Sequence, residues 1–94
     1  MIRYLSLLNY TDQGIRDIKD SPQRAHQFRS AIEQVGGKML AQYWAIGEND
    51  GCFIFEAPDE ATATKLLLDL GRKGNVRTRT MRVLDETEFR NSLP

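Results

Sequence analysis

The chain has 94 residues, of which 40% are hydrophobic and 28% are charged, and its 13 basic and 13 acidic side chains cancel. This length fits one domain spanning residues 1–94 with a modest core, and the composition is that of an ordinary globular protein. A net charge of zero offers no electrostatic footprint for nucleic acid or an anionic membrane. No apolar run approaches the ~20 residues that span a bilayer. We therefore expect a cytoplasmic protein with neither nucleic acid nor membrane as a partner.

Cysteine and histidine are too scarce for most metal and cofactor sites. Cys52 is the only cysteine and His26 the only histidine, which excludes an internal disulfide and a cysteine-based zinc cluster. No carboxylate-rich calcium loop and no phosphate-binding glycine motif is present. We expect no metal and no cofactor. His26 is read as a solvated surface residue, with a catalytic base as the alternative, and Cys52 as a small packed hydrophobe, with a reactive thiol as the alternative.

The first half of the chain predicts a strand, a helix and a second strand. Residues 2–9 place apolar side chains on both parities, which predicts burial on both faces of a strand. Thr11 is a candidate cap for a helical turn in the connection that follows. Ser21 and Pro22 predict the start of a helix, with the serine hydroxyl as its cap. The apolar stripe of this helix is Ala25, Phe28, Ile32 and Val35, and Gly36-Gly37 ends it.

Residues 38–47 predict a second strand that is again apolar on both parities. Leu40, Trp44 and Ile46 share one parity, while Met39, Ala41, Tyr43 and Ala45 share the other. Residues 48–51 predict a tight hairpin, because Asn, Asp and Gly tolerate positive φ. The third strand, residues 52–57, follows with both phenylalanines on one face.

The remaining residues predict a helix, an edge strand and a short final helix. The helix covers residues 59–70 and ends at Gly71; its stripe is Ala63, Leu66, Leu67 and Leu70. Residues 75–84 form the most polar strand, which favours a sheet edge. Asp85 is a candidate cap for a last helix that reaches Leu93.

The order β-α-β-β-α-β predicts an α+β fold of the ferredoxin-like kind, with a four-stranded antiparallel sheet and two helices on one face. The two helices can cover only one face of the sheet, yet the strands are apolar on both. We therefore expect the open face to meet a second copy of the chain, in a homodimer or a larger homo-oligomer.

Several segments carry a resemblance to a known family. They are Tyr10-Thr11-Asp12-Gln13-Gly14-Ile15, Lys19-Asp20-Ser21-Pro22-Gln23-Arg24, Tyr43-Trp44, Glu56-Ala57-Pro58-Asp59 and Gly74-Asn75-Val76-Arg77-Thr78. In this order and spacing the chain resembles the GYD domain family of small bacterial proteins. The resemblance implies a dimeric α+β barrel and no established activity. The family's Gly-x-Tyr-Asp stands here as Gly47-Glu48-Asn49-Asp50, with Asn49 in place of tyrosine.

Five residues are candidates for binding a small ligand: Asn9, Tyr43, Trp44, Arg77 and Thr78. Tyr43 and Trp44 are neighbours on a strand, so one should point towards the helices and one away; the alternative is that both are core or interface aromatics. Arg77 is either a rim ion-pair partner in the oligomer or a group that binds an anion or a carbonyl. Asn9 and Thr78 would add hydrogen bonds if the first and fourth strands are neighbours.

These features support a homo-oligomeric module that binds a small ligand or acts as an accessory protein. The alternative is a cofactor-independent oxygenase or isomerase, which other proteins of the barrel architecture suggest only by analogy. RNA binding is a third hypothesis, since Tyr4, Phe53 and Phe55 could stack bases, but the third strand lacks the basic-aromatic signature of RNA-recognition modules.

Overall fold

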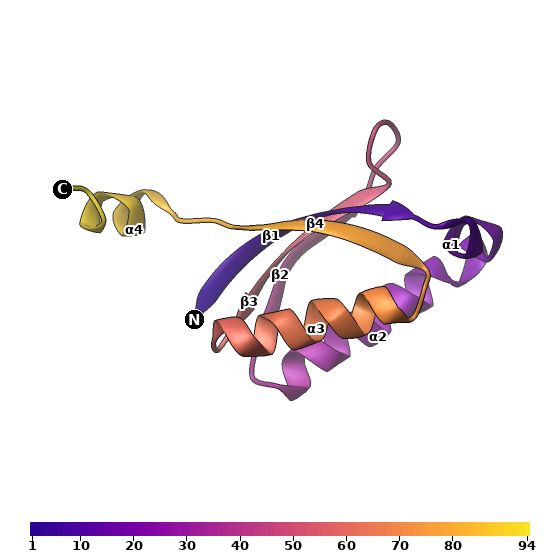
Figure 1. Ribbon diagram of the computed structural model, residues 1–94, viewed down its shortest axis with the longest axis horizontal. Coiled ribbons are helices and arrows are strands. Elements are labelled where there is room, and N and C mark those ends of the chain that lie inside the picture. The colour runs from indigo at the N-terminus through magenta and orange to yellow at the C-terminus, as the bar shows by residue number, and fades with distance from the viewer.

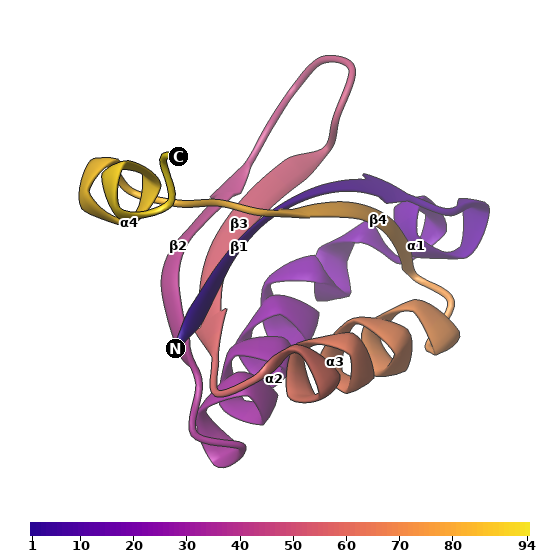
Figure 2. The ribbon, with the colours of Figure 1, turned by 60° about the vertical axis from the view of Figure 1, so that its left-hand side comes forward.

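The computed structural model describes all residues 1–94 and contains the predicted order of strands and main helices. The elements are β1 (Ile2–Tyr10), α1 (Asp12–Arg16), η1 (Ile18–Asp20), α2 (Ser21–Gln34), β2 (Lys38–Trp44), β3 (Gly51–Ala57), α3 (Glu60–Arg72), β4 (Val76–Arg82) and α4 (Glu86–Asn91). The four strands form one antiparallel sheet in the order β2-β3-β1-β4, which confirms the edge position of β4. Both long helices, α2 and α3, lie on the same side of this sheet (Figures 1 and 2).

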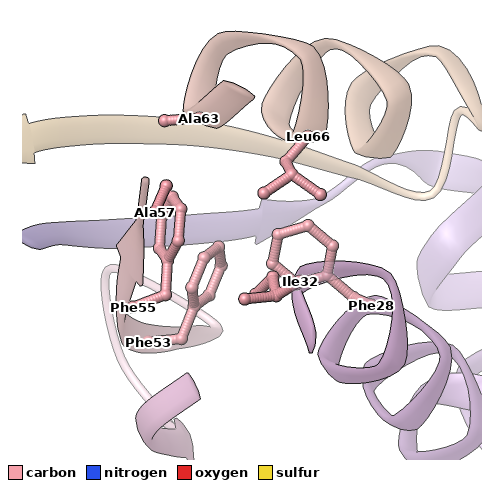
Figure 3. Packing of buried hydrophobic residues seen from close by; sticks show 7 residues of the cluster. All are labelled: Phe28, Ile32, Phe53, Phe55, Ala57, Ala63 and Leu66. Atoms are coloured by element: carbon pink, nitrogen blue, oxygen red, sulfur yellow. The ribbon is translucent and has the colours of Figure 1, made fainter. Parts of the chain in front are cut away.

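The core lies between β3 and the two long helices (Figure 3). Phe53 and Phe55 are two residues apart on β3 and therefore share a face of the sheet, so both rings point towards the helices. The ring of Phe28 on α2 meets Phe53 edge-on at a centroid distance of 5.1 Å, and Tyr4 on β1 stacks on Phe55 at 5.3 Å. The full buried cluster comprises Phe28, Ile32, Phe53, Phe55, Ala57, Ala63 and Leu66. The predicted stripes are therefore confirmed at Phe28 and Ile32 of α2 and at Ala63 and Leu66 of α3. Val35 was predicted to belong to the α2 stripe, but it is the C-cap residue and is 44% exposed.

The other side of the sheet is covered by neither long helix. Strand register assigns its side chains, because residues paired across antiparallel strands share a face. Leu5 pairs with Ile54 and Met81, and Leu7 pairs with Cys52. We call this surface the open sheet face; its apolar members are Leu5, Leu7, Ala41, Tyr43, Cys52, Ile54 and Met81.

Strand β2 departs from the prediction in two ways. Its register shifts between Met39 and Ala41, so Met39 pairs with Phe55 on the helix side whereas Ala41 pairs with Ile54 on the open side. A β-bulge inserts one extra residue, and the strict parity assigned from the sequence therefore fails. The strand also ends at Trp44 instead of residue 47, and residues 45–50 form a longer loop in place of the tight hairpin. The positive φ in this loop is at Gly47, not at an Asn or Asp.

The helix ends confirm some predicted caps and correct others. As predicted, Thr11 caps α1 and Asp85 caps α4, where it forms a capping box with Glu88. Asp59, which was predicted only as the first residue of the helix, is the cap of α3. Ser21 is not a cap: Asp20 holds that position, and Ser21 lies inside the first turn of α2. Helix α3 passes through the predicted stop to Arg72, and the positive φ that follows it belongs to Gly74. None of the helices combines the length and the apolar character needed to cross a bilayer.

Candidate functional site

A cavity of about 100 Å³ lies between the sheet and the helices at one end of the molecule. The end of β1, the start of β3, the first half of α2 and the end of α3 meet there. Its wall combines apolar and aromatic side chains with a few polar groups, which is the usual composition of a small-molecule site. The lining residues central to its chemistry are Leu8, Tyr10, Ser21, Arg24, Phe28, Trp44, Asp50, Phe53, Leu70, Lys73 and Val76.

A hydrogen-bonded group at Ser21 joins three elements beside this cavity. The indole Nε1 of Trp44 donates to Ser21 Oγ at 3.0 Å, and the hydroxyls of Ser21 and Tyr10 share a bond of 2.8 Å. Because Ser21 is buried in the first turn of α2, its hydroxyl ties that turn to β1 and β2 at once. The Trp44 ring is thereby held on the helix side of the sheet, as a wall of the cavity.

Charged groups of both signs lie at the cavity. Asp50 Oδ2 accepts the backbone N–H of Tyr10 at 2.8 Å. The Arg24 guanidinium donates to two backbone oxygens, those of Asp17 at 2.9 Å and Gly14 at 3.3 Å, and forms no ion pair. Lys73 is paired with Asp69 of its own helix end at 3.5 Å. The half-buried Arg24 is therefore a positive charge without a carboxylate partner.

The five sequence candidates divide between the two sides of the sheet. Trp44 lines the cavity and points towards the helices, while Tyr43 belongs to the open sheet face, although part of it borders the cavity. Asn9 and Arg77 are direct partners across β1 and β4 on the open side, whereas Thr78 pairs with Leu8 on the helix side. Asn9 donates to the backbone oxygen of Glu48 at 2.9 Å. The structure thus brings Asn9 and Arg77 together and separates them from Trp44 and Thr78.

Several polar residues of the cavity wall were not among those candidates, and four of them matter most for its chemistry: Tyr10, Ser21, Arg24 and Asp50. Ser21 was predicted to be a helix cap and Tyr10 to begin the connection after the first strand, and neither role suggests a binding group. The spacing of Ser21 and Arg24 carried a signal, because residues three apart on a helix share a face. Asp50 has no local signal, since its contact with Tyr10 joins residues 40 positions apart.

The rim of the open sheet face is charged. Arg3 lies opposite Glu56 and is bonded to Glu88 at 2.8 Å, with Glu56 at 3.6 Å and Asp85 at 3.9 Å. The backbone N–H of Asp85 and then the Arg3 guanidinium lower the pKa of Glu88 below its ordinary value, because both stabilise the carboxylate. Arg79 donates to Asn49 in the β2–β3 loop at 3.1 Å. This loop, which holds the residues aligned with Gly-x-Tyr-Asp, is thus linked to both β4 and β1.

The single histidine and the single cysteine lie outside the cavity. His26 is exposed on α2, and Cys52 is half-buried on the open sheet face. No group of three or more His, Cys, Asp or Glu side chains is arranged to hold a metal ion.

The four-stranded antiparallel sheet with both long helices on one face defines the chain as an α+β protein of the ferredoxin-like fold class. The GYD domain model matches residues 4–93, and the chain belongs to this family. It is 29% identical over 85 residues to the glutamine synthetase and cystathionine beta-lyase binding protein of Thermus thermophilus, and the match covers 89% of this chain and 90% of that protein.

Solved structures share the fold at low sequence identity. MtbAldR superposes with a TM-score of 0.70 and 13% identity, over 90% of this chain and 54% of that one. The feast or famine regulatory protein of M. tuberculosis, solved with L-methionine, gives 0.68 and 18%, over 90% and 51%. The chain thus spans about half the length of these two proteins. TTHA0845 of Thermus thermophilus gives 0.55 and 17%, over 90% of this chain and 95% of that one.

Proposed function

We propose that this protein is a cytoplasmic, homo-oligomeric accessory module that pairs through its open sheet face and binds a small ligand in the cavity beside Trp44. The observation that carries the proposal is the apolar centre of the open sheet face. Leu5, Leu7 and Ile54 occupy the two central strands there, with no helix across them. Tyr43 and Met81 extend the surface and are 65% and 49% exposed.

Pairing with a second copy is the physical remedy for such a surface. Contiguous apolar patches beyond roughly a few hundred Å² are rare on monomers, because their burial is favourable. A two-fold arrangement would bring the same patch of both copies together, with Arg77, Arg79 and the Arg3 cluster left at the rim. Charges at a rim stay hydrated and cost little on association.

An accessory role is supported by the Thermus thermophilus relative, whose name describes a protein that binds glutamine synthetase and cystathionine beta-lyase. The match covers about nine-tenths of both chains, so almost all of that relative has a counterpart in this chain. We propose that this chain likewise binds another protein, as an oligomer.

Sedimentation velocity at micromolar concentrations tests the pairing, with Ile54→Lys as the critical variant. A lysine at the centre of the open sheet face would have to be buried without a partner, so we expect the variant to sediment as a folded monomer. Leu68→Lys is the matched control, because Leu68 is 68% exposed on α3, away from the open face. A wild-type protein that sediments as a folded monomer would contradict the proposal.

The cavity also favours a second candidate, a cofactor-independent oxygenase or isomerase, because it is a partly polar space beside the sheet that could hold a small substrate. The test is to incubate the protein with a compound shown to occupy the cavity and to follow it by NMR, with and without oxygen. A compound that remains chemically unchanged while bound would exclude this second function for compounds of the same chemical class.

A further inference from the structure

The Ser21 group holds one hydrogen-bond donor that the folded chain does not use. Trp44 donates its only N–H to Ser21 Oγ, and the hydroxyls of Ser21 and Tyr10 share one bond. Whichever hydroxyl donates in that bond, the hydrogen of the other is left over. Both residues line the cavity. An oxygen atom of a ligand is the natural acceptor for this hydrogen.

Arg24 adds further unused donors at the same wall. A guanidinium has five N–H groups, and the two bonds to the backbone oxygens of Asp17 and Gly14 leave the others without protein acceptors. Arg24 is three residues after Ser21 on α2, so both side chains lie on one face of the helix. A cation and a hydroxyl donor on the wall of one cavity favour a carboxylate, which can accept hydrogen bonds from both.

Apolar side chains form the larger part of the remaining cavity wall, and the cavity is small. Leu8, Phe28, Phe53, Leu70 and Val76 line it, and none of them hydrogen-bonds through its side chain. A volume of about 100 Å³ is of the order of the engineered cavity that admits benzene, roughly 150 Å³. The apolar part of a ligand must therefore be no larger than a short branched chain or one aromatic ring.

We propose that the cavity binds a small carboxylic acid with a short apolar body. This proposal rests on the ligand-binding part of the proposed function. Arg24 and the free hydroxyl hydrogen of the Ser21–Tyr10 pair hold the carboxylate, and the body packs against Phe28 and Phe53. Asp50 Oδ1 has no hydrogen-bond donor of its own, since Tyr10 donates to Oδ2. A protonated amine next to the carboxylate would therefore improve binding. Two classes of compound carry the required carboxylate and apolar body: apolar amino acids and simple carboxylic acids.

Titration calorimetry with three probes of one carbon skeleton tests this chemistry: 4-methylpentanoate, its neutral amide, and L-leucine. We expect the acid to bind at least about tenfold more tightly than the amide, because a charge-assisted hydrogen bond is lost in the latter. L-leucine should bind more tightly than the acid. An acid tighter than L-leucine would assign the simple acids as the source. An amide that binds as well as the acid, or no binding by any probe, would overturn the proposal.

Arg24→Gln should weaken the acid about tenfold or more and leave the amide unchanged. Arg16→Gln is the matched control, since Arg16 is exposed on α1 and lines no part of the cavity. Equal affinities for the acid in wild type and Arg24→Gln would refute the role of the guanidinium.

Ala25→Leu provides a test that keeps every donor in place. Ala25 lines the cavity, so a larger side chain fills it and should abolish binding of all three probes. Ala61→Leu, at an exposed position of α3, should bind them as the wild type does. Undiminished binding by Ala25→Leu would place the site elsewhere. A protein that self-associates and binds neutral fragments in the cavity, but no carboxylate, would refute this inference and leave the proposed function standing.

Discussion

Ser6 is fully buried at the middle of β1, where the sequence alternation would favour an apolar residue. It pairs in register with Phe53 on one side and Thr80 on the other, and its Oγ lies 2.8 Å from Thr80 Oγ1. The small side chain leaves room for the Phe53 ring, and Thr80 satisfies its hydroxyl. This explains how a polar residue is tolerated against the core.

We predict that Ser6→Ala lowers the free energy of unfolding by about 1 kcal/mol, because the half-buried Thr80 hydroxyl loses its partner. Thr80→Val should cost a similar amount. The double variant should cost clearly less than the sum of the two, since it removes both polar groups together. Urea denaturation measures all three. Strict additivity would show that the two hydroxyls do not interact.

Gly14 and Gly71 form a second test at the residue scale. A Cβ on Gly14 would lie 1.9 Å from the backbone oxygen of Asn75, whereas a Cβ on Gly71 would meet nothing within 4 Å. Gly14→Ala should therefore destabilise the protein by about 1–3 kcal/mol through overpacking against backbone. Gly71→Ala, inside α3, should stabilise it by about 0.5–1 kcal/mol. Thermal unfolding of the two variants checks whether their stabilities change in opposite directions. A Gly14→Ala protein as stable as the wild type would contradict the close packing of α1 against the backbone of Asn75, the residue before β4.

At the scale of single elements, α4 is attached to the sheet through the carboxylate of Glu88. Its Glu88 accepts from the Asp85 N–H and from Arg3, and the pKa of this carboxyl lies below its ordinary value of 4.5. A lowered folded-state pKa means that its contribution is complete above pH 4.5 and is lost as the pH falls through the lower folded value.

We therefore predict that the amide protons of α4 lose exchange protection as the pH is lowered below 4.5, while those of β3 keep theirs. Glu88→Gln should show weak α4 protection already at neutral pH. Acidification should then change the protection less than in the wild type, because residue 88 no longer titrates. A small change should remain, since Asp85 and Glu56 still face Arg3. Hydrogen exchange followed by NMR gives both profiles. Protection of α4 that is unchanged in Glu88→Gln would rule out the Arg3–Glu88 contact as its anchor.

At the level of elements, the sequence predicts most of what periodicity and caps can encode. The order of strands and helices along the chain, both amphipathic helices and the caps at Thr11 and Asp85 follow from local pattern. The bulge between Met39 and Ala41 does not, because an inserted residue leaves each half of β2 with a regular alternation. The cavity is equally hidden, since Ser21 reads locally as a cap and its bonds to Trp44 and Tyr10 exist only after three elements meet.

At the scale of the whole molecule, the chain after β4 forms an arm that carries α4 away from the helix layer (Figures 1 and 2). Arg3 is its main attachment, through the backbone bond from Val83 and the ion pair with Glu88. Leu84, Phe89 and Leu93 are 42%, 57% and 56% exposed on this arm. Such an arm contributes nothing to the core cluster, yet its ion pair with Arg3 attaches it at the rim of the surface proposed for pairing.

We predict that a chain ending at Val83 keeps its fold and loses stability only slightly, because no core residue is removed. Its self-association should weaken about tenfold or more, since the buried apolar area of three side chains is lost from each copy. Phe89→Ser should give a smaller effect in the same direction. Sedimentation equilibrium measures the dissociation constants. If both variants associate as tightly as the wild type, the arm does not contact the second copy, and the open sheet face alone must hold the pair together.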